Sequence, residues 1–309
     1  MNIVYMGTPE FSVGPLKELI KHYNVSLVVT QPDRKVGRKQ EIKYSPVKEF
    51  ALKNGIEVFQ PEKIREDFQI ILDKKPDLII TCAYGQIVPK EILDYPKYRC
   101  INIHASLLPK YRGGAPIHHS IINGDEYTGV TIMYMDEKMD SGDILYQEKI
   151  KIEETDNVGT MFNKLSELGS KMIIDSLPGI IDGSIKPIKQ NEEEVTYAYN
   201  ISKEDEKIDF NNNSKDIFNK IRGLNPFPVS YALLDDKRVK FYSSKIGSSN
   251  KEGVVGEIIN IYDNGLGIKT KDGEIVIEEL QFEGKKKSTF KEYLNGIQDK
   301  EKLLGKVFK

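Results

Sequence analysis

One uninterrupted apolar segment, Asp77–Ala83 (DLIITCA), constrains the fold more than any other part of the chain. A strand without alternation has both faces buried, as in a parallel sheet covered by helices on both sides. The start of the chain agrees with such a sheet, because it has apolar strand patterns at Asn2–Met6 and Val25–Thr30. Between them a helix is expected, with Thr8 as its cap and Pro9 at its first position. We therefore predict an α/β domain: a Rossmann-like, mostly parallel sheet with helices on both faces.

The pattern changes in the last third of the chain, and 309 residues are enough for two domains. Residues 189–194 are charged and lack apolar periodicity, so we expect a linker over 189–205. Short alternating strands follow, with a hairpin signal at Asp272-Gly273. They are expected at Ser230–Leu234, Val239–Ser243, Val254–Ile261, Gly265–Thr270 and Glu274–Leu280. The prediction is a first domain over 1–188 and a small, OB-like β-barrel over 206–309.

Composition limits the classes of function. The formal net charge of −2 excludes a strongly basic protein, so any contact with nucleic acid has to come from local patches. Cys82 and Cys100 lie in apolar runs and predict a buried, reduced pair. No apolar run has the length of a membrane span, and a strand begins at the first residues, which predicts a cytoplasmic protein. No cluster has metal-ligand spacing, so no metal site is expected.

The segment Arg99–Pro116 holds the strongest candidate for chemistry. Successive side chains of a strand point to opposite faces, so Asn102 and His104 share one face as the apolar run ends. Farther on, a hairpin of Thr128–Met135 and Ile144–Ile152 carries Asp140 in its turn. His104 satisfied in a core and Asp140 serving only the turn remain alternatives. Read as a site, amide, imidazole and carboxylate suit acyl or one-carbon transfer without a covalent enzyme intermediate.

Several other classes of enzyme are disfavoured. The turn after the first strand, Gly7–Ser12 (GTPEFS), lacks two of the three glycines that bind a dinucleotide pyrophosphate, and Glu10 would repel the phosphates. A Walker phosphate loop, a serine nucleophile elbow and a Cys/His nucleophile pattern are also missing from the sequence.

Three further segments have both a structural and a functional interpretation. The long loop Gln31–Pro46 is either a solvated connection or a binding loop for a polyanion, and it carries the cations Arg34, Lys35, Arg38 and Lys39. The segment Tyr84, Gly85, Gln86 and Ile87 either leads into the next helix or offers backbone polar groups to a planar ligand. Lysines at 285–287 are either solvated surface or a weak indication of RNA binding.

The segment Asn102–Pro109 (NIHASLLP), with Asp140 downstream in Met139–Asp143 (MDSGD), resembles the folate-dependent formyltransferases. In that family the matching Asn, His and Asp form the catalytic trio. The resemblance therefore implies that Asn102 and His104 stabilise an oxyanion, and that Asp140 orients His104 and assists proton transfer. It also implies folate contacts, which we assign to Ser106, Leu107, Leu108 and Pro109 and to Tyr84, Gly85, Gln86 and Ile87.

Further motifs resemble the members of the family that formylate initiator methionyl-tRNA. These motifs are Gly7–Phe11, Gln31–Arg34 with Gly37-Arg38, Ser45–Lys48, Ala83–Gly85 and Arg222–Pro228. The resemblance implies transfer of the formyl group of 10-formyltetrahydrofolate to the methionyl amine. The folate is then a co-substrate, no cofactor is tightly bound, and the protein is a monomer. Cations expected to contact the tRNA are Arg34, Lys35, Arg38, Lys39, Arg222, Lys285, Lys286 and Lys287.

Three alternatives remain open at this point. The acceptor could be a small amine, such as an amino sugar nucleotide or a glycinamide ribonucleotide. The chain could hydrolyse formyl-folate, or it could bind tRNA without catalysis. Small-amine enzymes would need neither the basic loop nor a barrel with a lysine-rich end, and Asn102, His104 and Asp140 favour catalysis.

Overall fold

The computed structural model describes residues 1–36, 40–297 and 299–309, and in it these residues form two compact units. The first comprises residues 1–116, 127–151 and 162–199, and the second comprises 117–126, 152–161 and 200–309. This division groups segments that are distant in the sequence. The predicted linker over 189–205 stays a prediction as a domain boundary, although its residues up to 199 belong to the first unit.

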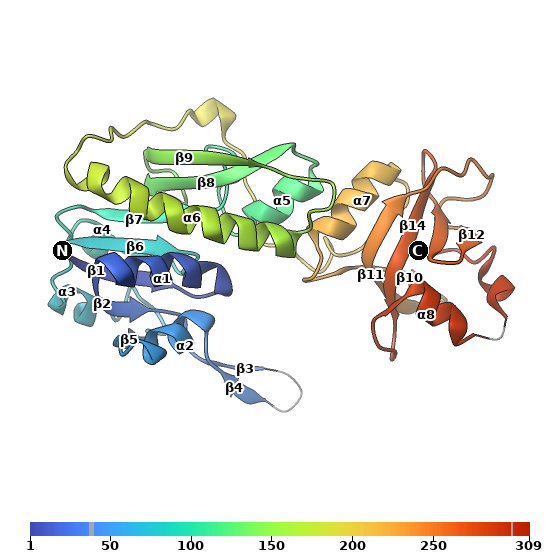
Figure 1. The fold of residues 1–309 in the computed structure, drawn as a ribbon, viewed down its shortest axis with the longest axis horizontal. Coiled ribbons are helices and arrows are strands. Elements are labelled where there is room, and N and C mark those ends of the chain that lie inside the picture. The colour runs from blue at the N-terminus through green and yellow to red at the C-terminus, as the bar shows by residue number, and fades with distance from the viewer. Residues whose placement is uncertain (37–39, 298) are drawn as a thin grey trace. The chain divides into compact units, whose positions relative to one another are not determined.

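The first unit is built on a mixed sheet, which has seven strands among the described residues (Figure 1). The first five strands in spatial order run parallel, and the last two are added antiparallel. The order is β5 (Val58–Phe59), β2 (Asn24–Val29), β1 (Asn2–Gly7), β6 (Leu78–Cys82), β7 (Cys100–His104), β8 (Tyr127–Tyr134) and β9 (Ile144–Lys151). The predicted α/β fold class is confirmed, and β6 is buried along its whole length, as its unbroken apolar run requires.

Helices cover both faces of this sheet. One face packs against α1 (Val13–His22) and the long α6 (Val158–Ile181), and α6 passes so close to the sheet that a Cβ on Gly169 would lie 3.0 Å from Ile103. The other face carries a cluster that includes residues of α3 (Gln69–Asp73) and α4 (Lys90–Leu93). Additional helices are η1 (Glu10–Ser12), α2 (Pro46–Lys53) and η2 (Glu192–Glu194).

Two local predictions for this unit are wrong. Thr8 does not cap the first helix: its hydroxyl donates to the carbonyl of Tyr84, and Pro9 occupies the cap position before η1. The loop Gln31–Pro46 contains a hairpin of β3 (Arg34–Val36) and β4 (Glu41–Lys43). The hairpin was missed because its strands are short and largely polar, so they show no apolar alternation.

The second unit is an antiparallel sheet that its own C-terminus closes. Its strands are β10 (Ser230–Leu234), β11 (Lys237–Ile246), β14 (Glu274–Phe282), β13 (Gly265–Lys269), β12 (Ile258–Tyr262) and the short β15 (Ser288–Thr289). The amide of Ile258 donates to Lys306 at 2.8 Å, and Leu233 and Lys309 exchange two backbone hydrogen bonds. The last residues thus bridge the two edge strands, and the predicted small barrel is confirmed. Helices of this unit are α5 (Pro116–Ile122, begun by the last residue of the first unit), α7 (Ser214–Gly223), α8 (Phe290–Asn295) and η3 (Lys300–Leu303).

His118, on α5, makes the stability of the second unit depend on pH. Burial lowers the pKa of this imidazole from 6.5 to about 4, and its ring packs edge-on against Phe227. Between pH 6.5 and 4, His118 is therefore protonated in the unfolded chain but neutral in the folded chain. The free energy of unfolding consequently decreases as the pH falls through this range. We expect this one group to remove on the order of 3 kcal/mol over that range. Urea unfolding at pH 7 and pH 5 should show a smaller loss for His118→Gln than for wild type, whereas His22→Gln, at an exposed helix end, should match wild type.

No helix in the part of the chain that the structure covers is long and apolar enough to cross a membrane. Cys82 and Cys100 are both buried, and each is a free thiol.

Candidate active site

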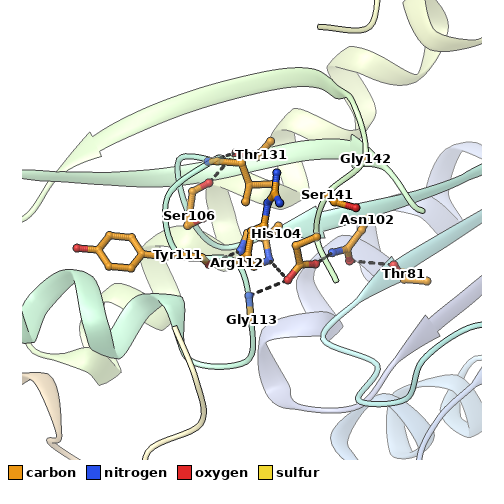
Figure 2. Close-up of polar contacts among 12 residues, drawn as sticks. Thr81, Asn102, His104, Ser106, Tyr111, Arg112, Gly113, Thr131, Ser141 and Gly142 are labelled. Carbon is orange, nitrogen blue, oxygen red and sulfur yellow. Dashed lines mark hydrogen bonds and ion pairs between the residues drawn. The ribbon is translucent and has the colours of Figure 1, made fainter. Parts of the chain in front are cut away.

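The three residues of the predicted trio lie together at the carboxyl end of β7. Asn102 and His104 project from the same face of that strand (Figure 2). Asp140 comes from the connection between β8 and β9. The Asp140 carboxylate accepts from the amide of Gly113 at 2.8 Å and from Asn102 Nδ2 at 3.4 Å. Its Oδ2 lies 3.8 Å from His104 Nδ1. Strand β8 pairs antiparallel with β7, so the turn that follows β8 lies beside Asn102 and His104.

The hydrogen bonds of His104 define which nitrogen exchanges a proton. Its Nε2 lies 2.9 Å from the carbonyl oxygen of Tyr111, which can only accept, so Nε2 carries a hydrogen. The exchangeable position is therefore Nδ1, which faces Asp140. At 3.8 Å the carboxylate is beyond hydrogen-bond distance and acts on the ring through its charge. Backbone at Tyr111 takes a φ of 63°, a left-handed conformation in the loop whose carbonyl holds the ring.

Thr81 fixes the orientation of the Asn102 amide. The Thr81 hydroxyl donates to Asn102 Oδ1 at 2.8 Å, so the Nδ2 group of Asn102 is directed to Asp140. Figure 2 shows Thr81 beside Asn102 on the neighbouring strand. Thr81 is a site residue that was not predicted from the sequence. A polar side chain inside the apolar run of β6 was the signal that could have identified it.

The predicted folate segment Ser106–Pro109 is a loop after β7 that several hydrogen bonds hold in place. Ser106 is fully buried, and its hydroxyl donates to the carbonyl of Lys110 at 2.7 Å. Thr131 donates to the Ser106 carbonyl at 2.6 Å, and Gln147 donates to the Leu108 carbonyl at 3.0 Å. Leu107 and Pro109 remain partly exposed, whereas Leu108 is buried. Ser106 thus builds the loop, and the partly exposed residues are the ones that can meet a ligand.

The second predicted folate segment, Tyr84–Ile87, is anchored at Tyr84 and at Gln86. Tyr84 is buried, and its carbonyl accepts from Thr8 and from Gln31. Gln86 is held by the backbone of the segment near Pro61: its Oε1 accepts from the amide of Ile64 at 2.8 Å. Gly85, at φ 93°, and Ile87, which is 84% exposed, are left at the surface. A planar ligand can therefore meet an exposed isoleucine beside a backbone turn.

The cations predicted to bind tRNA fall into three groups. Arg34 and Lys35 are exposed on β3, while Arg38 and Lys39 lie outside the described residues. Arg222 is engaged within the second unit, since its Nη1 donates to the carbonyls of Glu153 at 2.9 Å and Asp156 at 3.1 Å. Burial lowers the pKa of its guanidinium. The lysines at 285–287 are exposed, and Lys287 pairs with Glu279 at 2.7 Å.

A segment predicted as linker also belongs to this site. Residues 190–198 run beside the loop 109–115: the amide of Arg112 donates to the carbonyl of Thr196, and the amide of Tyr111 donates to the Thr196 hydroxyl. Arg112, in this loop, is 3% exposed. A Cβ on Gly113 would lie 2.6 Å from the Ala198 carbonyl, which explains the glycine at this close approach. The packing of this segment was not predicted, because its charged composition is typical of a solvated linker.

The described side chains offer no group of three or more His, Cys, Asp or Glu that could hold a metal ion. What the site presents is an amide donor, an imidazole and a carboxylate at a strand end, flanked by two anchored loops.

The α/β fold and the Asn102, His104 and Asp140 trio are typical of formyl transferases, and comparison with protein families gives the same class. Residues 1–177 match the formyl transferase family and residues 200–298 match the formyl transferase C-terminal domain. The chain belongs to the formyl transferase family, and the expected resemblance is confirmed. A methionyl-tRNA formyltransferase of Bacillus licheniformis is 50% identical over 298 residues, which cover 95% of this chain and 94% of that protein.

Solved structures share the fold. A sugar 3N-formyl transferase, WlaRD, crystallised in the presence of dTDP and 5-N-formyl-THF, has a TM-score of 0.67 and 24% identity, covering 93% of this chain and 99% of its own. The methionyl-tRNA formyltransferase from Clostridium thermocellum has a TM-score of 0.56 and 20% identity, covering 80% of this chain and 94% of its own. At these identities the likeness concerns the fold.

Proposed function

We propose that the chain transfers the formyl group of 10-formyltetrahydrofolate to the amino group of methionine on initiator methionyl-tRNA, and so serves translation initiation. The observation that carries the proposal is the convergence of Asn102, His104 and Asp140 in a chain that is 50% identical to a methionyl-tRNA formyltransferase. We further propose that it acts as a monomer in the cytoplasm.

In this reaction the methionyl nitrogen attacks the formyl carbon, and a carbon–nitrogen bond forms as the formyl oxygen becomes negative. The Nδ2 group of Asn102 and a protonated Nδ1 of His104 lie at the same strand end and stabilise that oxygen. The bond between the formyl carbon and N10 of the folate then breaks, and the amine proton balances the charge on N10. The Asp140 carboxylate, 3.8 Å from His104 Nδ1, orients the ring and can receive the amine proton on the way, directly or through water.

Folate is a co-substrate in this proposal and leaves as tetrahydrofolate. The two anchored segments, Ser106–Pro109 and Tyr84–Ile87, would hold it, with the partly exposed Leu107 and the exposed Ile87 supplying apolar contact. The crystal structure of WlaRD, which was determined in the presence of 5-N-formyl-THF, supports this choice of ligand for the fold.

The hairpin cations give the proposal a salt-dependent prediction. Arg34 and Lys35 are exposed on β3, where they can neutralise tRNA phosphates. The double variant Arg34→Ala with Lys35→Ala should raise KM for methionyl-tRNA about tenfold at low salt. The slope of log kcat/KM against log salt concentration should fall in magnitude by about 2. KM for 10-formyltetrahydrofolate should not change.

A matched control removes two exposed lysines elsewhere, Lys17 and Lys53, which lie on α1 and α2. The control should keep the wild-type salt slope. Equal slopes for both double variants would show that the hairpin does not bind tRNA.

Acceptor competition tests the proposed function itself. Wild-type protein and 10-formyltetrahydrofolate are incubated with methionyl initiator tRNA, with an amino sugar nucleotide and with glycinamide ribonucleotide, separately and together. We expect formylation of the charged tRNA and no product from the small amines. Preferential formylation of a small amine, or release of formate without an acceptor, would replace the proposal with a small-amine formyltransferase or a hydrolase.

A further inference from the structure

The side-chain amide of Gln190 makes all four of its hydrogen bonds inside the first unit, two as donor and two as acceptor. The side chain is 5% exposed, although it lies in a segment whose composition predicts a linker. Its Nε2 donates to the carbonyls of Asp140 and Gly142, each at 2.8 Å. These two carbonyls bracket the turn that carries the Asp140 carboxylate into the site.

Arg112 holds the other end of the same amide. Its Nε and Nη2 donate to Gln190 Oε1 at 3.1 and 2.9 Å. A guanidinium only donates and a carbonyl only accepts, so the orientation of the amide follows from its partners. The buried charge of Arg112 is balanced by Glu192, whose carboxylate lies 2.8 Å away. The arginine also leads directly into Gly113, whose amide donates to Asp140 Oδ2.

Asp140 needs such support because its backbone is strained. Its φ of 49° is left-handed, a conformation that costs a residue with a Cβ free energy unless its surroundings hold it there. Rotation of that peptide would redirect the carboxylate away from His104 Nδ1 and Asn102 Nδ2. The interactions that resist the rotation come from Gln190 on the backbone side and from Gly113 on the carboxylate side.

We propose that Gln190, held by Arg112, is a positioning residue that sets the direction of the Asp140 carboxylate during formyl transfer. The inference rests on the proposed function for its kinetic consequence, and on the hydrogen bonds alone for its structural one. Gln190 touches neither substrate nor reacting atoms in this scheme. Its role is to keep a strained turn in the one conformation in which the carboxylate faces the imidazole.

The test uses two variants of Gln190 and one charge control. Gln190→Glu keeps the length and the acceptors for Arg112 but removes both donors. Gln190→Met removes the donors without adding a charge. Asn191→Asp adds the same negative charge one residue away, on an exposed side chain whose oxygen accepts from the amide of Glu193 in either form.

Two readouts separate the structural claim from the kinetic one. Amide hydrogen exchange of the peptide covering residues 136–143 reports the turn whether or not the substrate is correct, and it should accelerate in both Gln190 variants. In the formylation assay kcat should fall between about tenfold and about 100-fold, as for a reacting group misplaced by about 1 Å. KM for both substrates should stay near wild type.

Unchanged exchange in the turn, or kcat within threefold of wild type for both Gln190 variants, would overturn the inference. If Asn191→Asp lowers kcat as much as the Gln190 variants do, the effect is due to charge, and the inference is also overturned. Faster exchange in the Gln190 variants, with no formylation by wild type, would uphold the structural role and reject the proposed function.

Discussion

Replacing His104 by alanine is expected to lower kcat for formylation about 1000-fold, because the variant loses both an oxyanion donor and the ring beside the Asp140 carboxylate. KM for 10-formyltetrahydrofolate should remain close to wild type, since the folate segments are anchored through Thr131, Gln147 and Gln86 independently of the ring. Single-turnover kinetics with saturating methionyl-tRNA measures the chemical step directly.

The control for this prediction is His22→Ala, at an exposed helix end in the same unit. It should retain wild-type kinetics. The His104 variant leaves the Tyr111 carbonyl without its ring donor, so thermal unfolding and tetrahydrofolate binding are measured in parallel. Near-wild-type turnover by a folded, folate-binding His104→Ala would remove the imidazole from the mechanism.

Asp140→Asn is expected to lower kcat about 100-fold while preserving the shape of the side chain. An amide oxygen can still accept from the Gly113 amide, so the turn is retained. What is lost is the negative charge 3.8 Å from His104 Nδ1. Because the two side chains act as a unit, the double variant with His104→Ala should lose little more than His104→Ala alone.

Asp136→Asn is the matched control, since it removes one carboxylate charge from an exposed residue of the same β8–β9 connection. It should behave as wild type. Losses from Asp140→Asn and His104→Ala that multiply in the double variant would show that the two groups act independently, contrary to the geometry.

The sequence predicts the part of this site that a single strand determines. The two-residue period of β7 places Asn102 and His104 on one face, and the structure has them there. Asp140 lies 38 residues beyond Asn102, and no local rule brings them together. The motif predicted the pair, and the antiparallel addition of β8 explains it.

The parts that escaped prediction depend on contacts between distant segments. Gln190 falls in the predicted linker, and the sequence does not show that Gln190 and Arg112 are buried, because burial of a charge or an amide depends on partners that composition does not reveal. Thr8 has the residue type of a helix cap, but the carbonyl of Tyr84 competes successfully for its hydroxyl. The spacing of the short strands predicted the barrel. Its closure by residues 305–309 was not predicted, because it relies on backbone hydrogen bonds of the last residues, which leave no sequence pattern.

The most direct test of the account is a single-turnover experiment with formyl-labelled 10-formyltetrahydrofolate and methionyl initiator tRNA, followed by release of the amino acid from the tRNA. We expect the label to appear in N-formylmethionine, with one tetrahydrofolate formed for each formyl group transferred. Label recovered as formate, or left on the folate while folded protein and charged tRNA are both present, would contradict it.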